Sequence, residues 1–203
     1  MVDLKVILCD LKPDLVQAWL AAFPPEHYPQ VEVWQCSFDQ LKAEMLVSPA
    51  NSFGFMNGGI DGAYSAYLGQ EMVDDLQGII KEEWNGEIPV GCATHVLTGN
   101  EQFPVLISAP TMRVPAFIGG TNNVYMATRA ALIVAKNLIY EGVVLLGSTI
   151  LIPGMGTGVG GVTPEECAFQ MRAAYNDIVL EMNEFPESLF DASVKHNLIL
   201  QKD

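Results

Sequence analysis

Short apolar runs alternate along the chain with longer segments in which apolar residues recur at helical spacing. Runs with the length of buried strands occur at 4–9, 31–34, 45–47, 105–109, 143–152 and 197–201. Helical spacing occurs at 13–22, 62–68, 72–84, 123–140 and 164–183. The segment 88–104 is compatible with a loop or a hairpin. This alternation predicts a layered α/β domain, and because no repeat or boundary is evident we expect one domain over residues 1–203.

Local signals refine the ends of these elements. Pro13 suits the first turn of its helix, and the sequence Thr163-Pro-Glu-Glu166 predicts a capping box. Asp61 is expected to cap the start of the helix at 62–68, and Gly69 to end it. The run 143–152 is the most apolar of the chain, which is typical of a central strand buried on both faces, with an interruption near Gly147.

Composition indicates a folded, acidic protein. Half of the residues are hydrophobic, enough for a substantial core, and 24 acidic residues against 10 basic ones give a formal net charge of −14. Proteins that bind nucleic acid usually present a basic surface to its phosphates. We therefore expect no nucleic-acid partner, and any phosphate group must be held by local donors.

The chain gives no signal for a membrane or a metal. It has no run of 18 apolar residues, and its first ten residues lack the order of charges and apolar positions found in signal peptides. The four cysteines are dispersed and read as small buried hydrophobes rather than as a disulfide or metal site. We expect a cytoplasmic protein with no membrane partner, no metal and no cofactor.

Two segments stand out because they are rich in glycine and almost uncharged. The first, 51–64, contains Asp61 as its sole charge, and the second, 153–164, contains no charge. Each follows an apolar strand and precedes a helix. Glycine allows a close approach of the backbone, and successive N–H groups beside a helix N-terminus can hold an anion without a lysine. The alternative is that both segments only make tight turns above a sheet.

The second segment also matches a dinucleotide-binding pattern, with glycines at 156, 158 and 161. That pattern needs an acidic residue at the end of a following strand, whereas Asp177 lies inside the predicted helix. The remaining chain is also too short to complete a nucleotide-binding half. We therefore discount this match.

The residues around both segments resemble the signature of the macrodomain family. Leu46-Val-Ser-Pro-Ala-Asn51 and Asn57-Gly-Gly-Ile-Asp-Gly-Ala63 are similar to the family's first loop, in which a buried strand ends in Asn-Ala-Ala-Asn before a glycine cluster and a Val-Asp-Gly-Ala helix start. Gly156-Thr-Gly-Val-Gly160 is similar to the second loop. The spacing from Asn51 to Asp61 matches that of hydrolytic members.

The resemblance implies a three-layer α/β/α fold with a central mixed sheet and ADP-ribose bound in a cleft at the strand ends. It implies ligand contacts at Ser37, Phe38, Asn51, Gly58, Gly59, Ile60, Gly156, Thr157, Gly158, Val159 and Gly160. The Asn51 amide is expected to bond the distal ribose, and the glycines of 156–160 to donate N–H groups to the diphosphate.

The resemblance also implies candidate catalytic residues, Asn51 and Asp61. In hydrolytic relatives the aspartate that matches Asp61 positions or activates water for attack at the anomeric carbon. A carboxylate there can act as a general base or stabilise an oxocarbenium-like centre. Two structural alternatives stay open: Asn51 bonding only the backbone of its loop, and Asp61 serving only as a helix cap.

The chain departs from the family pattern at four places. Ser37 stands where the family usually has an adenine-binding aspartate, and Phe38 stands at an aliphatic position. Ser48-Pro49 replaces Asn-Ala, and Gly160 replaces an aromatic residue that packs on the distal ribose in many members. Serine can accept a hydrogen bond without charge assistance. These differences indicate a more open pocket, weaker binding or a modified ligand.

Three functions remain in view. The first is binding of ADP-ribose or an ADP-ribosylated substrate, extending to hydrolysis of an ADP-ribosyl bond of the mono-ADP-ribosyl or O-acetyl-ADP-ribose type. The second is a reader that binds ADP-ribose or a related nucleotide without turnover. The third is a structural or assembly protein that keeps the fold without the ligand.

Overall fold

The computed structural model describes residues 3–200, and within them the strands form one mixed sheet in the order β2-β1-β6-β3-β5-β4. The strands are β1 (Lys5–Cys9), β2 (Val31–Trp34), β3 (Met45–Ser48), β4 (Thr94–Leu97), β5 (Val105–Ser108) and β6 (Thr149–Ile152). Neighbouring strands run parallel except for β4, which pairs antiparallel with β5 at one edge. The segment 88–104, expected to be a loop or a hairpin, contains strand β4, which pairs with the following strand β5, itself predicted at 105–109.

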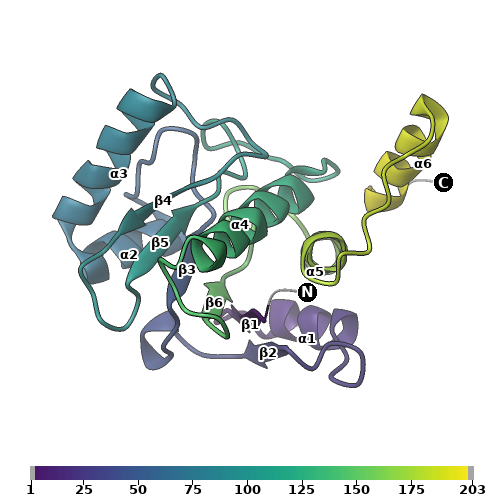
Figure 1. The fold of residues 1–203 in the computed structure, drawn as a ribbon, viewed down its shortest axis with the longest axis horizontal. Helices are drawn as coiled ribbons and strands as arrows, with labels where there is room; N and C mark the ends of the chain where they lie inside the picture. Colours follow the sequence, from purple (N-terminus) through teal and green to yellow (C-terminus); the bar gives the residue numbers. More distant parts are fainter. Residues whose placement is uncertain (1–2, 201–203) are drawn as a thin grey trace.

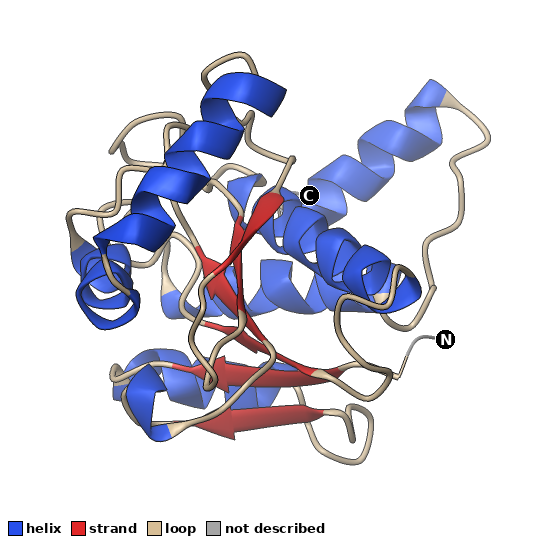
Figure 2. Cartoon of the chain, turned by 60° about the vertical axis from the view of Figure 1, so that its left-hand side comes forward, coloured by secondary structure: helices blue, strands red, loops and turns tan. Residues whose placement is uncertain are grey.

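Helices cover both faces of the sheet, which makes the three-layer α/β/α arrangement (Figures 1 and 2). The helices are α1 (Pro13–Ala22), α2 (Gly59–Leu68), α3 (Gln70–Glu83), α4 (Asn123–Tyr140), α5 (Pro164–Ile178) and α6 (Leu189–Ile199), with a short 3-10 helix η1 (Phe38–Gln40). Helices α1, α4 and α5 share one hydrophobic cluster with the sheet, whereas α2 and α3 share the other. The sheet is therefore buried on both sides.

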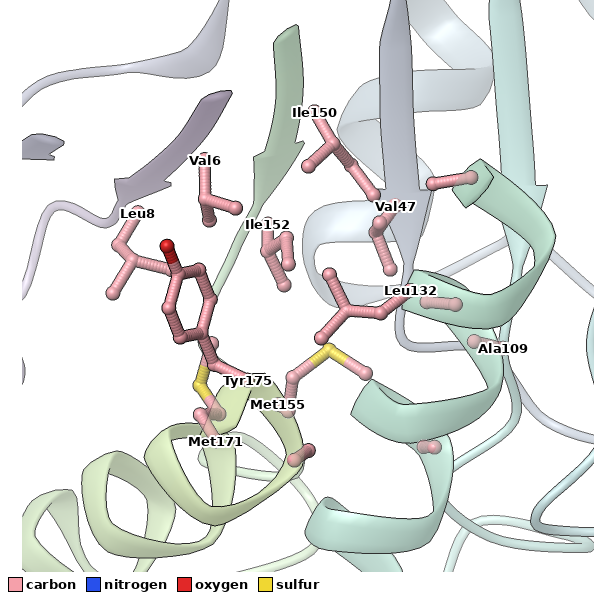
Figure 3. Packing of buried hydrophobic residues seen from close by; sticks show 14 of the residues in the cluster. Val6, Leu8, Val47, Ala109, Leu132, Ile150, Ile152, Met155, Met171 and Tyr175 are labelled. Atoms are coloured by element: carbon pink, nitrogen blue, oxygen red, sulfur yellow. The ribbon is translucent and has the colours of Figure 1, made fainter. Parts of the chain in front are cut away.

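The alternation of side chains along each strand divides the core into these two clusters. Val6 and Leu8 of β1 face the α1, α4 and α5 side, together with Ile150 and Ile152 of β6 (Figure 3). Between them in sequence, Leu151 faces the α2 and α3 side. Because alternate side chains enter two different cores and both are buried, the strands read as continuous apolar runs in the sequence.

The strand order brings three loops to one edge of the sheet. Strands β1, β6 and β3 are neighbours and parallel, so their carboxyl ends lie side by side. The loops that leave these ends lead to α1, α5 and α2, respectively. In open α/β sheets this edge is where ligands bind.

The predicted strand 143–152 is correct only in its last four residues, and the interruption expected near Gly147 is confirmed. Strand β6 begins at Thr149, and the residues before it form turns in which Leu145 is 80% exposed. Gly142 and Gly147 both have positive φ, at 73° and 82°. Because extended backbone needs negative φ, Gly147 interrupts the strand whatever the apolar content around it, and Gly142 lies in the turn that follows α4.

The predicted final strand at 197–201 is wrong. Residues 197–199 belong to α6, and residue 201 lies outside the described residues. Helix α6 extends away from the rest of the chain (Figure 1), and no side chain within its bounds is buried.

Three helix boundaries also differ from expectation. Helix α5 ends at Ile178 rather than 183, and Glu181 beyond it has a left-handed φ of 56°, which helical backbone cannot adopt. Helix α2 begins three residues early, with Gly58 at the N-cap position, so Asp61 is not its cap. Helix α3 begins two residues early, at Gln70, immediately after Gly69 ends α2 as predicted.

The capping box at the start of α5 forms in one half only. The Thr163 hydroxyl accepts a hydrogen bond from the Glu166 N–H at 3.2 Å, as predicted. The Glu166 carboxylate does not turn back to Thr163; its Oε1 accepts from the Gly120 N–H at 2.8 Å. Glu166 therefore ties the turn before α4 to α5.

Candidate functional site

A cleft of about 560 Å³ lies at the carboxyl ends of the central strands. Both glycine-rich loops line it, named here loop 1 (residues 51–61, which follow β3 and include the first turn of α2) and loop 2 (residues 153–163, between β6 and α5). The structure brings together in this cleft Ser37, Phe38, Asn51, Gly58, Gly59, Ile60, Asp61, Gly156, Thr157, Gly158, Val159 and Gly160. Every residue that the sequence predicted for the site therefore lines one space.

Both loops carry runs of main-chain N–H groups that are not used by the protein. Among residues 3–200, the N–H groups of 157–160 in loop 2 donate to no carbonyl or side chain. The same holds for 57–61 in loop 1, where the first turn of α2 leaves its N–H groups without helical partners. Two such runs facing one cleft can hold an anion together with the N-terminal end of a helix dipole.

The closure of loop 2 explains why Gly160 is glycine. A Cβ at Gly160 would lie 2.4 Å from the Gly156 carbonyl oxygen, which no side chain tolerates without movement of the backbone. The loop is closed by hydrogen bonds from Gly161 N–H to Gly158 O and from Val162 N–H to Gly156 O. Gly158, by contrast, has open space where its Cβ would be. An aromatic side chain at 160 is therefore incompatible with this loop conformation.

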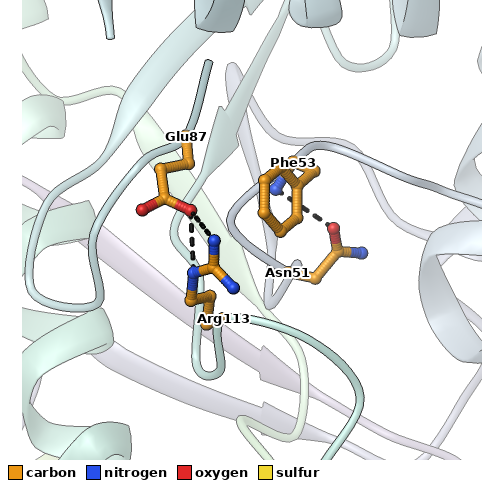
Figure 4. Close-up of polar contacts among 4 residues, drawn as sticks. All are labelled: Asn51, Phe53, Glu87 and Arg113. Carbon is orange, nitrogen blue, oxygen red and sulfur yellow. Dashed lines mark hydrogen bonds and ion pairs between the residues drawn. The ribbon is translucent and has the colours of Figure 1, made fainter. Parts of the chain in front are cut away.

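Asn51 organises loop 1 from within. Its Oδ1 accepts a hydrogen bond from the N–H group of Phe53 at 3.1 Å (Figure 4). The same oxygen accepts from the Phe55 N–H at 3.4 Å, and Nδ2 donates to the Phe55 carbonyl at 2.8 Å. The predicted loop-backbone role of Asn51 is thus present. Because Asn51 also lines the cleft, a ligand contact stays a prediction.

Asp61 presents a carboxylate with an altered acidity to the cleft. Its Oδ1 accepts a hydrogen bond of 2.6 Å from the hydroxyl of Ser48, which is fully buried at the end of β3. Burial raises the pKa of Asp61 from 3.8 to about 6, although the Ser48 hydrogen bond lowers it. The carboxylate is therefore ionised at neutral pH but close to its protonation midpoint, as suits a general base.

At the end of the cleft that follows β2, the lining includes two buried aromatic side chains in contact with each other, Phe38 and Tyr64. Phe38 is buried and meets the ring of Tyr64 edge-on, with centroids 4.8 Å apart. Tyr64 lines the cleft, and burial raises the pKa of its hydroxyl well above the usual value. That hydroxyl has no hydrogen-bond partner among residues 3–200. Ser37 lies directly before η1, and its hydroxyl makes no cap bond to that helix.

Two cysteines also lie at this end. The Cys9 thiol donates to the Cys36 carbonyl at 3.0 Å, and the two sulfur atoms are 3.8 Å apart. Burial, together with the neighbouring Cys36, raises the pKa of Cys9 to about 12. Both cysteines are free thiols, as are Cys92 and Cys167.

Sequence reasoning missed the loop between β1 and α1, which supplies Asp10, Leu11 and Lys12 to the cleft. The Lys12 ammonium donates to the Thr157 carbonyl of loop 2 at 2.9 Å, and the Asp10 carboxylate accepts from the Lys12 N–H at 3.0 Å. Among the described residues that line the cleft, Lys12 is the one basic side chain. The available signal was a strand followed directly by a charged turn and Pro13.

Arg113 lies outside the cleft lining and is paired with Glu87 at 2.8 Å. No group of three His, Cys, Asp or Glu side chains within 3–200 is arranged to hold a metal ion. In the same residues, no helix combines the length and the hydrophobicity that crossing a bilayer requires.

Comparison with known proteins identifies the family. A sequence model of the Macro domain matches residues 47–171, more than half of the chain, so this protein belongs to the Macro domain family. An uncharacterized protein of Aquifex aeolicus is 36% identical over 141 residues, covering 70% of this chain and 78% of that protein. An uncharacterized protein of Aeropyrum pernix is 34% identical over 131 residues, and the match spans 64% of this chain and 61% of the relative.

Solved structures agree on the fold. The macrodomain of Mycobacterium tuberculosis DarG gives a TM-score of 0.57 at 20% identity, over 70% of this chain and 87% of that one. The Oceanobacillus iheyensis macrodomain with ADP gives a TM-score of 0.56 at 23% identity, and the match covers 78% of this chain and 83% of that one. A glycine-to-valine mutant of the same macrodomain with ADPR gives a TM-score of 0.57 at 20% identity, and the match covers 78% of this chain and 85% of that one. At these identities the likeness establishes the three-layer fold, confirming the expected fold class.

Proposed function

We propose that this protein binds ADP-ribose, or the ADP-ribosyl group of a modified substrate, in the cleft between loop 1 and loop 2. The observation that carries the proposal is the pair of unpaired N–H runs, at 57–61 and 157–160, that line one open cleft. A diphosphate lying between the loops would satisfy both runs. Solved macrodomains with ADP and ADPR support this ligand class.

The electrostatics of the chain fit the same proposal. A net charge of −14 repels a phosphate at long range, so local donors must hold it. The N–H groups provide dipoles that are fixed by the fold, and Lys12 adds one positive charge beside loop 2. Binding therefore depends on the conformation of the two loops rather than on the overall field.

The length of the cleft fits an extended ligand. Loop 1 follows β3 and the segment with Ser37 follows β2, and two strands, β1 and β6, lie between them. At a spacing of about 4.8 Å per strand, the two ends are about 14 Å apart. We place the adenine at the Ser37 end, the diphosphate between the loops, and the distal ribose near Asn51.

We further propose that the protein hydrolyses an ADP-ribosyl bond, because Asp61 lines the cleft as a carboxylate with a pKa of about 6. Such a group can take a proton from water as the water oxygen attacks the anomeric carbon and the bond to the leaving group breaks, and it can then return that proton to the leaving group. For an O-acetyl ester the same water would attack the acetyl carbonyl carbon, and the ribose oxygen would leave with the proton. The Ser48 hydroxyl donates a hydrogen bond to Oδ1 of this carboxylate and thereby fixes its orientation. Glycosidic and ester linkages of ADP-ribose are the matching substrate class.

The proposal is tested by calorimetric titration with ADP-ribose, followed by hydrolysis assays on a mono-ADP-ribosylated protein and on O-acetyl-ADP-ribose. We expect binding by the wild type, and hydrolysis that the Asp61→Asn variant loses while it keeps its affinity. Binding with no turnover in either protein would identify a reader instead. No binding at millimolar ADP-ribose would reject the ligand and favour a structural role for the fold.

A further inference from the structure

Each of the three loops around the cleft presents one exposed apolar side chain to it. These are Leu11 before α1 at 68% exposure, Phe55 in loop 1 at 57%, and Val159 in loop 2 at 70%. Single apolar residues on a surface need no explanation, but three that line one cleft indicate a ligand surface. Phe55 is the aromatic member and has the largest area to offer.

The backbone of Phe55 is fixed on both sides. Asn51 holds its carbonyl and its N–H through the amide group, with Nδ2 to O at 2.8 Å. The preceding residue, Gly54, has a φ of 67°, and a Cβ there would lie 2.7 Å from Cδ1 of Ile80 in α3. The turn at Gly54 therefore packs closely against the buried face of α3, and the backbone that carries the exposed Phe55 ring is fixed in position.

A brace outside the cleft holds the neighbouring ring of Phe53. The Arg113 guanidinium lies over Phe53 at 5.1 Å and pairs with Glu87, with both Nε and one terminal nitrogen 2.8 Å from the same carboxylate oxygen (Figure 4). Phe53 in turn lies 6.4 Å from Phe55, centroid to centroid. Three consecutive contacts thus link Glu87 to the cleft side chain.

The main chain of this brace is tied to the sheet edge. The Ser52 N–H donates to the Arg113 carbonyl at 3.1 Å, and the Ile88 N–H donates to the Ser52 carbonyl at 2.8 Å. Asn51 also forms an isolated parallel bridge with Met112. The β3–β5 pairing therefore continues past the strand ends into loop 1, which rigidifies the approach to Phe55.

We propose that Phe55 is a specificity-determining residue whose ring packs against the terminal sugar of the bound ligand, at the end of the cleft opposite Ser37. This rests on the proposed function and deepens it. Gly160 cannot carry a side chain in the observed loop 2, and among the described residues that line the cleft Phe55 is the one exposed aromatic side chain. A ring already held in position loses little entropy when the sugar packs on it, which favours affinity.

The proposal is tested by titrating Phe55→Ala and Phe55→Leu with ADP-ribose, ADP and AMP, which differ in the terminal sugar and the diphosphate. We expect Phe55→Ala to bind ADP-ribose about two- to tenfold more weakly than wild type, the range of an aromatic contact. Phe55→Leu should restore part of the affinity. ADP and AMP should bind all three proteins within about twofold, because they lack the terminal sugar.

Two further variants separate packing on the ligand from general damage. Phe185→Ala removes a ring that is 93% exposed and outside the cleft lining, and should leave every affinity unchanged. Arg113→Met removes the brace; combined with Phe55→Ala it should add no further loss for ADP-ribose, because Arg113 acts through Phe55.

Wild-type binding of ADP-ribose with an unchanged affinity in Phe55→Ala would overturn this inference while leaving the proposed function intact. Equal losses for ADP-ribose, ADP and AMP would also overturn it, since they would show that the substitution disturbs the whole loop. If wild type fails to bind ADP-ribose, the proposed function and this inference fall together.

Discussion

Ser48 and Asp61 are joined by a hydrogen bond of 2.6 Å from hydroxyl Oγ to carboxylate Oδ1. The bond connects the last residue of β3 to the first turn of α2 across the base of loop 1. Burial raises the pKa of Asp61 to about 6, and the Ser48 hydroxyl opposes that rise. The Ser48–Asp61 hydrogen bond therefore affects both the position of the carboxylate and its state of ionisation.

Removing the Ser48 hydroxyl should make Asp61 a weaker acid. In Ser48→Ala, burial acts on Asp61 without the opposing hydrogen bond, so its pKa should rise above 6 and less of it should be ionised at neutral pH. NMR titration of the Asp61 carboxyl carbon measures this directly. Ser65→Ala is the control, because Ser65 lies on the same helix and bonds Met56 and Gly62 carbonyls instead. An unchanged or lower midpoint in Ser48→Ala would contradict the assignment.

The raised pKa of Asp61 also makes the stability of the fold depend on pH. Between pH 4 and 6 the folded state holds a proton that the unfolded chain has released, so stability falls as the pH rises through this window. The loss is at most about 3 kcal/mol and is reduced by the remaining solvent exposure of the group. Urea unfolding of wild type and Asp61→Asn at pH 4 and 7 should show the variant gaining relative stability at pH 7. A difference in unfolding free energy between the two proteins that is the same at pH 4 and pH 7 would contradict the raised pKa of Asp61.

Gly158 and Gly160 form a matched pair for testing loop 2. Gly160→Ala places a Cβ 2.4 Å from the Gly156 carbonyl oxygen and should lower the melting temperature and weaken ligand binding. Gly158→Ala has open space for its Cβ, so it should keep the wild-type melting temperature. If ligand phosphate approaches the backbone at 158, the same variant should still lose affinity for ADP-ribose. Unchanged binding by Gly158→Ala would place the diphosphate elsewhere.

Lys12 should contribute a salt-dependent part of the affinity. In Lys12→Met the ammonium beside Thr157 is lost, and we expect ADP-ribose to bind about two- to fivefold more weakly at low ionic strength. The difference should shrink as salt is added, because the interaction is partly exposed. Lys42→Met removes an exposed lysine outside the cleft lining and is the control. Equal salt dependence in Lys12→Met and wild type would rule out a contact between this charge and the ligand.

The sequence was sufficient for the layered architecture and for the two loops of the site. Strand and helix periods identified most elements, and helix α4 at Asn123–Tyr140 was predicted to the residue. The glycine runs of loop 1 and loop 2 were recognisable because close backbone approach and strand-to-helix turns need that composition. Both signals are local in the sequence, so they can be interpreted without knowledge of the strand order.

What sequence reasoning missed depends on long-range arrangement. The place of β1 between β2 and β6 put Lys12 beside loop 2, although 145 residues separate it from Thr157. The apolar stretch before Thr149 read as strand because of its hydrophobicity, although the interruption expected near Gly147 is present, where φ is 82°. The apolar residues of α6 suggested a buried strand, whereas they lie on an exposed helix.

The central claim is that main-chain N–H groups of both loops hold the diphosphate of the ligand. The most direct measurement is an amide-resolved NMR titration of the wild-type protein with ADP-ribose. We predict that the resonances of 57–61 and 157–160 move together with one dissociation constant, and that ADP reproduces the shifts of both runs. Ligand-induced shifts confined to one loop, or to residues outside both, would contradict the claim.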